Sequence, residues 1–268
     1  GKGALDANTT ASNNTAVGGQ NALGANTTGA QNTAIGGGAL AANTTASNNT
    51  SVGHASLIRN TTGASNVAVG VDALNFNSTA SNNTAVGMSA LVANTTGTQN
   101  IAVGATAGDA LTEGNYNVAV GYTALGTDTK GSKSVALGNY ALAFQNLTSA
   151  TDTYNTAVGH LAGYQVTTAT FNTLIGGLAG DAITTGGANT AVGYSALTTS
   201  TTGSNNTSIG RESLRVTTTG SNNVGVGSYA MYDNTTGGSN VAIGESALSN
   251  NTTASNNTAV GKSALLAN

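Results

Sequence analysis

A glycine that follows Val, Ile or Leu recurs at every seventeenth position along nearly the whole chain. Two intervals are longer, because one extra residue lies near Gln20 and Asn21 and four extra residues lie within 143–154. A fixed period of this size is typical of stacked-repeat architectures, in which each repeat contacts only its neighbours. We therefore expect one repeat domain over residues 1–268. The fifteen glycines are Gly18, Gly36, Gly53, Gly70, Gly87, Gly104, Gly121, Gly138, Gly159, Gly176, Gly193, Gly210, Gly227, Gly244 and Gly261.

Each repeat is numbered here from the residue after its glycine, so that the glycine is position 17 and residues 71–87 form one complete copy. Positions 14 and 16 carry β-branched residues, and turn-forming Gly, Asn, Ser and Thr lie on both sides of them. A unit of this length is too short and too rich in Gly and Asn for a helical hairpin. The sequence predicts an all-β fold, a β-solenoid (β-roll) of about sixteen 17-residue coils.

The charged residues indicate which positions face solvent, because an unpaired charge is almost never buried. No charge falls at positions 3, 4, 8 or 13 to 17, so we expect these positions to build the interior. Position 4 is usually Leu, and positions 14 and 16 share one strand face that we expect to pack against it. In three coils Gly replaces this Leu, and an aliphatic residue then replaces the usual Asn at position 7. Position 7 should therefore point inward as well.

Position 15 is Ala in most coils and by alternation should face away from positions 14 and 16. Together with Asn at position 13 and Gly at position 17 it forms a small, neutral strip, which we interpret as a surface for another sheet or chain. The alternative is a tight coil that has no room for larger side chains there. Asn recurs at position 13 in all but one coil, which predicts an amide ladder between stacked coils.

Composition excludes several classes of function. Charged residues are 6% of the chain and the formal net charge is -3, so there is no basic surface for nucleic acid. Cysteine is absent, and the two histidines, His54 and His160, lie in different coils. We expect no catalytic, cofactor-binding or metal site, and, because no apolar run reaches about 18 residues, no membrane insertion. Gly1–Leu5 matches Gly261–Leu265 in register, which favours a piece of a longer array.

All eleven aromatic residues fall at positions where charges also occur, which predicts that they are exposed. One column at position 12, formed by Tyr116, Lys133, Tyr154 and Phe171, is a candidate edge for binding glycans or proteins, with a cation–π contact around Lys133. Ordinary stacking between coils is the alternative. Asn-x-Thr/Ser sequons are abundant. The best candidates for glycosylation are those at position 12 and in the insertion, namely Asn13, Asn48, Asn82, Asn205, Asn256 and Asn146.

Two short motifs resemble known families. "NTAVGYSAL" at 189–197 and "NTAVGMSALVANTTGTQN" at 83–100 resemble the repeats of bacteriophage and metagenomic tail-fibre proteins. "SVALGNYALA" at 134–143 is similar to the head repeats of YadA-like trimeric autotransporter adhesins. The resemblance implies an extracellular or virion-borne β-roll, often trimeric, whose function is reach and attachment.

The function expected from these observations is a structural fibre or filament shaft, located outside the cell, at the cell surface or on a virion. Its expected partners are copies of itself, placed side by side, end to end or both, as a trimer or a filament. The alternative is an adhesin that recognises surface glycans through the aromatic edge. Ice binding is a minor alternative, because the adjacent Thr pairs of "NTTG" divide between two faces of a coil.

Overall fold

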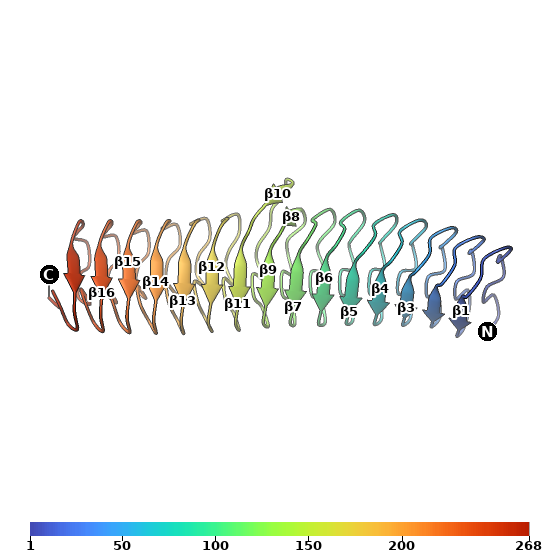
Figure 1. The fold of residues 1–268 in the computed structure, drawn as a ribbon, viewed down its shortest axis with the longest axis horizontal. Helices are drawn as coiled ribbons and strands as arrows, with labels where there is room; N and C mark the ends of the chain where they lie inside the picture. The colour runs from blue at the N-terminus through green and yellow to red at the C-terminus, as the bar shows by residue number, and fades with distance from the viewer. Residues whose placement is uncertain (268) are drawn as a thin grey trace. The chain divides into compact units, whose positions relative to one another are not determined.

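The computed structural model describes residues 1–267, which fold without any helix into two compact units. Unit 1 comprises Gly1–Lys133 and Thr148–Thr151, and unit 2 comprises Ser134–Leu147 and the residues from Asp152 onward. Each unit is a parallel β-solenoid whose coils contribute one three-residue strand each (Figure 1). The predicted fold class is therefore confirmed, whereas the expectation of one domain over residues 1–268 stays a prediction.

In unit 1 the strands lie side by side in chain order and pair in parallel. They are β1 (Thr15–Val17), β2 (Thr33–Ile35), β3 (Thr50–Val52), β4 (Val67–Val69), β5 (Thr84–Val86), β6 (Ile101–Val103) and β7 (Val118–Val120). Within unit 2 the same arrangement holds. Its strands are β9 (Val135–Leu137), β11 (Thr156–Val158), β12 (Thr173–Ile175), β13 (Thr190–Val192), β14 (Thr207–Ile209), β15 (Val224–Val226), β16 (Val241–Ile243) and β17 (Thr258–Val260).

The strand register shows where the two irregular repeats place their extra residues. Most strand partners follow the period of the sequence, as where Val67 pairs with Thr84. In contrast, Thr15 pairs with Thr33, and Val135 pairs with Thr156. These two longer offsets match the predicted insertions of one and four residues. Part of the longer insertion forms the short strand β10 (Thr151–Asp152), and unit 1 contains one further two-residue strand, β8 (Gly131–Ser132).

The glycine at position 17 is required by both backbone conformation and space. At Gly87 the φ angle is +139°, and a Cβ atom there would lie 2.4 Å from the carbonyl oxygen of Gly104 in the next coil. L-residues rarely adopt such a φ, and no real Cβ approaches backbone so closely. This double constraint explains why the glycine period is the strongest signal in the sequence.

Three further positions in each coil are left-handed, although most are not glycine. In one repeat these are Asn82 at position 12, Ser89 at position 2 and Leu91 at position 4, with φ of +62°, +56° and +49°. A left-handed residue with a Cβ costs roughly 1 kcal/mol. At Leu91 this cost is offset because the side chain is fully buried and the amide nitrogen lies 3.0 Å from the carbonyl oxygen of Ala107 in the next coil.

The strand faces are reversed relative to the prediction. Ala85 and Ala102 at position 15 are fully buried, whereas Ile101 and Val103 at positions 14 and 16 are 44% and 37% exposed. Of the expected outer strip, positions 13 and 15 therefore lie on the inner side, and the glycines at position 17 are half-buried in most coils. A Cβ on Gly225, also at position 15, would lie 3.2 Å from the Leu214 side chain. Because the position-4 Leu fills the interior, only small residues fit opposite it on the strand.

The inward predictions for positions 4 and 7 were correct, whereas the Thr or Ser at position 8 is half-buried in most coils. Leu91 at position 4 and Asn77 at position 7 are fully buried. Where Gly108, Gly163 and Gly180 replace the Leu, the aliphatic residues at position 7 are also fully buried, namely Leu111, Val166 and Ile183. One charged residue departs from the rule that charges face solvent. Asp128, at position 7, is buried, and its Oδ1 accepts a hydrogen bond from the backbone N–H of Gly131 at 3.0 Å.

Buried asparagines form two ladders along the coils. At position 13, Asn83 accepts a hydrogen bond from the backbone N–H of Asn100 at 2.9 Å and donates its own side-chain N–H to the carbonyl of Gly97 at 2.8 Å. The expected ladder is thus confirmed, and it runs mainly through the backbone. At position 7 the contact is amide to amide, since Asn94 donates to Oδ1 of Asn77 at 2.9 Å. This second ladder stops at Asn94, whose Oδ1 is buried without a partner because Leu111 follows it.

Candidate interaction surfaces

The outward strand face consists of positions 14 and 16 and is the main unexpected feature of both units. Position 16 is Val, Ile or Leu in every coil, and position 14 is Thr, Val or Ile. Its side chains are exposed or half-buried, with exposed fractions of 37% to 44% at Ile35, Ile101, Val103, Ile175, Ile209 and Ile243. No charged residue lies on this face. It is a flat, mostly aliphatic surface on a parallel sheet, and it is neutral.

The candidate aromatic edge at position 12 is divided between the two units. Tyr116 and Lys133 belong to unit 1, whereas Tyr154 and Phe171 belong to unit 2. The structure brings Tyr154 and Phe171 together, with their ring centroids 5.9 Å apart and their planes 13° from parallel. These two rings are 50% and 58% exposed, and Tyr116 is 54% exposed. The predicted exposure is confirmed, but the cation–π contact around Lys133 stays a prediction.

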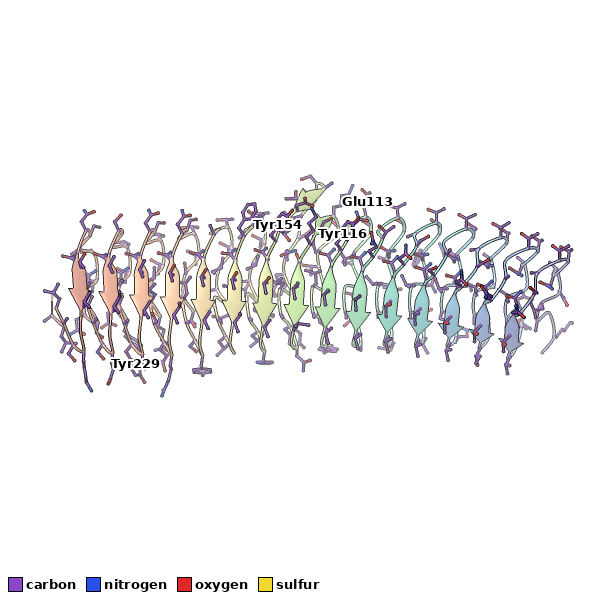
Figure 2. The ribbon with its side chains drawn as sticks, in the orientation of Figure 1. Glu113, Tyr116, Tyr154 and Tyr229 are labelled. Carbon is purple, nitrogen blue, oxygen red and sulfur yellow. The ribbon has the colours of Figure 1, made fainter. Side chains whose placement is uncertain are left out.

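Aromatic residues at different repeat positions lie at different ends of their coils. Figure 2 shows Tyr116 and Glu113 at the end of a coil where the strand begins, and Tyr229 of unit 2 at the end where the strand finishes. Position 12 and position 2 are therefore separate surfaces.

Three arginines contact aromatic rings, and the sequence analysis did not identify these pairs. The guanidinium carbon of Arg59 lies 4.1 Å from the ring centroid of Phe76, and that of Arg215 lies 5.4 Å from the ring centroid of Tyr232. Arg211 also faces Tyr229 and forms an ion pair with Glu212 at 3.1 Å. In the first two pairs the partners share a repeat position in adjacent coils, so the repeat alignment alone could have predicted these contacts.

The candidate glycosylation sites are accessible, whereas other sequons are not. All six candidates, Asn13, Asn48, Asn82, Asn146, Asn205 and Asn256, are exposed. In contrast, the sequon asparagines at position 7, such as Asn26 and Asn43, are fully buried and hydrogen-bonded in their ladder. Glycosylation of the exposed sites stays a prediction.

The titratable residues do not converge on one site. His54 and His160 are exposed, as position 1 predicts, and they belong to different units. Within residues 1–267 no three His, Asp or Glu side chains lie close enough together to hold a metal ion. Asp109 and Asp181 at position 5 are partly buried, and burial raises the pKa of both carboxyls, that of Asp181 to about 6. The expectation that the chain has no catalytic residues stays a prediction.

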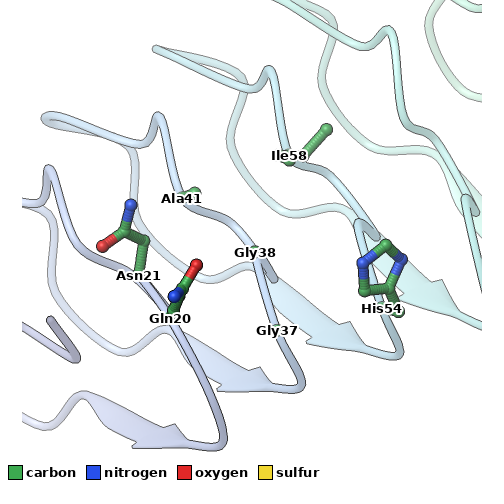
Figure 3. Close-up of a pocket in the computed structure, with 7 residues that line it drawn as sticks. All are labelled: Gln20, Asn21, Gly37, Gly38, Ala41, His54 and Ile58. Carbon is green, nitrogen blue, oxygen red and sulfur yellow. The ribbon is translucent and has the colours of Figure 1, made fainter. Parts of the chain in front are cut away.

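A small notch interrupts the surface of unit 1 at positions 1, 2 and 5. It measures about 370 Å³ and is lined by Gln20 and Asn21 on one side, His54 and Ile58 on the other, and Gly37, Gly38 and Ala41 between them (Figure 3). The notch was not predicted from the sequence, because it arises where one coil has only Gly37, Gly38 and Ala41 at positions that carry larger side chains in the coils beside it.

Comparison with known proteins gave no match, whether to a protein-family model, to a curated protein or to a solved structure. Over the described part of the chain there is no helix with the length and apolar character needed to cross a lipid bilayer.

Proposed function

We propose that this chain is a structural shaft that assembles with further copies of itself through the outward strand face. The observation that carries the proposal is that position 16 of every three-residue strand in both units presents an aliphatic side chain that is exposed or half-buried. A continuous exposed apolar surface of several hundred Å² marks an interaction site on most soluble proteins. Seven strands spaced about 4.8 Å apart, each presenting an aliphatic residue at position 16 and Thr, Val or Ile at position 14, reach that order of size within unit 1 alone.

A second copy of the chain is the partner that best fits this face. Because no charge lies on it, a partner with charged groups would lose solvation there without gaining a counter-charge. Another copy presents the same neutral Thr and aliphatic columns at the same spacing, so side chains from one face can fill the gaps in the other. The resemblance to tail-fibre and adhesin repeats supports the same conclusion, and also a location outside the cell or on a virion.

The test introduces charge at two adjacent position-16 residues, as Val86→Lys with Val103→Lys. The matched control places the same charges at exposed position 9, as Thr79→Lys with Thr96→Lys. Position 9 already carries Glu113 in a later coil. Sedimentation equilibrium and electron microscopy should show oligomers or filaments for the natural chain and the control, and monomers for the position-16 variant. A natural chain that stays monomeric at all concentrations would overturn the proposal.

A second function is favoured by the stacked pair at position 12. Tyr154 and Phe171 form a rigid aromatic platform that is half exposed, and such surfaces suit the apolar faces of sugar rings in surface glycans. If Tyr116→Ser, Tyr154→Ser and Phe171→Ser together abolished attachment to glycan-coated surfaces and left assembly intact, adhesion would be the function of this edge. Loss of assembly in the same variant would show that the rings are structural.

Ice binding is supported least. The outward strand face carries Thr at position 14, but Val67, Ile101 and Val118 interrupt this column in unit 1. A regular array of hydroxyl and methyl groups is therefore not maintained from coil to coil. Thermal hysteresis measured at millimolar concentration should be absent, and clear hysteresis would favour this function over self-assembly.

A further inference from the structure

The notch in unit 1 replaces one layer of side chains on the surface formed by positions 1, 2 and 5. In the flanking coils these positions carry side chains such as Gln20, Asn21, His54 and Ile58, whereas the coil between them has Gly37, Gly38 and Ala41. Since successive coils are about 4.8 Å apart, the gap is as thick as one flat ring. Figure 3 shows the polar side chains of Gln20 and Asn21 and the ring of His54 on opposite sides of this gap.

The backbone does not require glycine at the floor of the notch. Gly37 has no left-handed φ, and a Cβ there would meet only the His54 ring, at an ordinary 3.7 Å. Gly38 is left-handed, but Asn21 and Ala55 adopt the same conformation at position 2 with φ of +59° and +55°. A Cβ at Gly38 would lie 3.1 Å from Cδ1 at the flexible end of the Ile58 side chain, so a small shift of Ile58 would admit it. The glycines at position 17 are structural, whereas these two chiefly keep the notch open.

The walls of the notch offer hydrogen bonds and apolar contact but no charge. Within residues 1–267 the side chains of Gln20, Asn21 and His54 have no hydrogen-bond partner in the protein. The methyl groups of Ile58 and Ala41 line the remaining surface. No Asp, Glu, Lys or Arg lines the notch, so an ionic ligand would find no counter-charge. A purely apolar ring would in turn leave the amide and imidazole groups unpaired.

We propose that this notch is a binding site for one neutral sugar ring. A pyranose presents hydroxyl groups at its rim, which can bond the amides of Gln20 and Asn21, and C–H groups on its face, which can pack on the His54 ring and the Ile58 side chain. The volume of about 370 Å³ is within the range of small-ligand sites, about 300–1,000 Å³. The sugar would occupy the place of the missing side-chain layer, so the site lies apart from the outward strand face and does not rest on self-assembly.

The decisive variant is Gly37→Tyr, which fills the notch with a residue that position 1 already carries at Tyr122 and Tyr194. Its matched control is Ala105→Tyr, which adds the same ring at position 1 of a coil away from the notch. The probes are the methyl pyranosides of glucose, galactose and mannose, observed by saturation-transfer NMR and by shifts of the His54 ring signals. One expects weak binding, with Kd of about a millimolar.

Gly37→Tyr should reduce this binding at least about tenfold, while Ala105→Tyr leaves it unchanged and both variants keep the circular dichroism spectrum of the natural chain. His54→Ala should weaken binding without filling the notch. Absence of signal for every pyranoside, or equal signal in the Gly37→Tyr variant, would overturn the proposal. All three variants should still form the oligomers of the natural chain, which would show that a loss of sugar binding is independent of self-assembly.

Discussion

The two faces of each three-residue strand differ in a way that reverses the usual distribution of side chains. The inner face carries the smaller residue, Ala85 for example, and the outer face carries the larger Thr84 and Val86. The interior of a coil is so narrow that the Leu at position 4 and the amides at positions 7 and 13 already fill it. The strand contributes only a methyl group to the core, and its larger aliphatic side chains remain available for a partner.

The sharpest test of this comparison places the same charge on each face in turn. Ala85→Glu buries a carboxylate against the position-4 leucines with no counter-charge, and should lower the free energy of unfolding by about 3–5 kcal/mol. Val86→Glu, one residue away on the outer face, should change it by less than about 1 kcal/mol. Thermal and urea unfolding followed by circular dichroism measure both values. Equal losses in the two variants would contradict the assignment of the faces.

The period, the strand positions and the inward Leu and Asn could be predicted from the sequence, because they depend on residue types that repeat in register. Which strand side chains point into the coil could not be predicted from β-branched residues alone. An alternation of large and small residues is compatible with either orientation of a strand in a thin coil. A better signal was present. Ser occurs at position 15 only as Ser51 and Ser208, and at position 3 only as Ser56 and Ser213, each five residues later. In the structure the Oγ atoms of Ser51 and Ser56 lie 2.6 Å apart in the core.

The candidate sites also differ in how far they could be predicted from the sequence. The stack of Tyr154 on Phe171 followed from their shared repeat position. The notch did not, because it depends on which of the glycines in one coil are dispensable. Only the geometry distinguishes Gly36, with φ of +131° and no room for a Cβ, from Gly37, which has both room and an ordinary backbone.

A second prediction concerns the polar part of the inner side. Asn83→Ala removes the acceptor of the buried Asn100 backbone N–H, whereas the Gly97 carbonyl keeps a second donor, the side-chain N–H of Asn94 at 2.9 Å. Because one unsatisfied buried group costs about 1–3 kcal/mol, the variant should lose about that much of its free energy of unfolding. Asn82→Ser is the control, since the neighbouring residue is exposed and Ser65 occupies the same repeat position. Urea unfolding of both variants checks the difference, and a similar small loss in each would show that the ladder is dispensable.

A third, smaller effect should appear as coupling between the two buried serines. Ser51→Ala and Ser56→Ala each break the hydroxyl pair, whereas the double variant restores the Ala found at both positions in most coils. Each hydroxyl has a single proton, and one hydroxyl can donate to the other only while the second donates to a backbone carbonyl within reach, so the coupling energy should be about 0.5–1 kcal/mol. A double-mutant cycle from urea unfolding measures it. Strictly additive losses would mean that positions 3 and 15 do not interact.

The last prediction concerns a carboxyl at the boundary between the two sides. Burial raises the pKa of Asp181 from 3.8 to about 6, although the backbone N–H groups of Asp181 and Ala182 partly oppose this, and Oδ1 is buried without a partner. A raised pKa means that the folded state binds the proton more tightly than the unfolded state. The stability from this group is therefore fully present below pH 3.8 and is lost as the pH rises through about 6.

Asp181→Asn removes this titration, so its free energy of unfolding should decline less between pH 4 and 7 than that of the natural chain, and should be the higher of the two at neutral pH. Asp109→Asn should act in the same direction, because burial raises that pKa as well. Glu245→Gln is the control, since this exposed carboxylate pairs with Lys262 on the surface.

The effect of Asp181→Asn is expected to be the smallest of the four, because the Asp181 side chain is only half-buried and solvent weakens the cost of burying its charge. Urea unfolding at each pH measures it, and identical slopes for Asp181→Asn and the natural chain would place this carboxyl on the outer side.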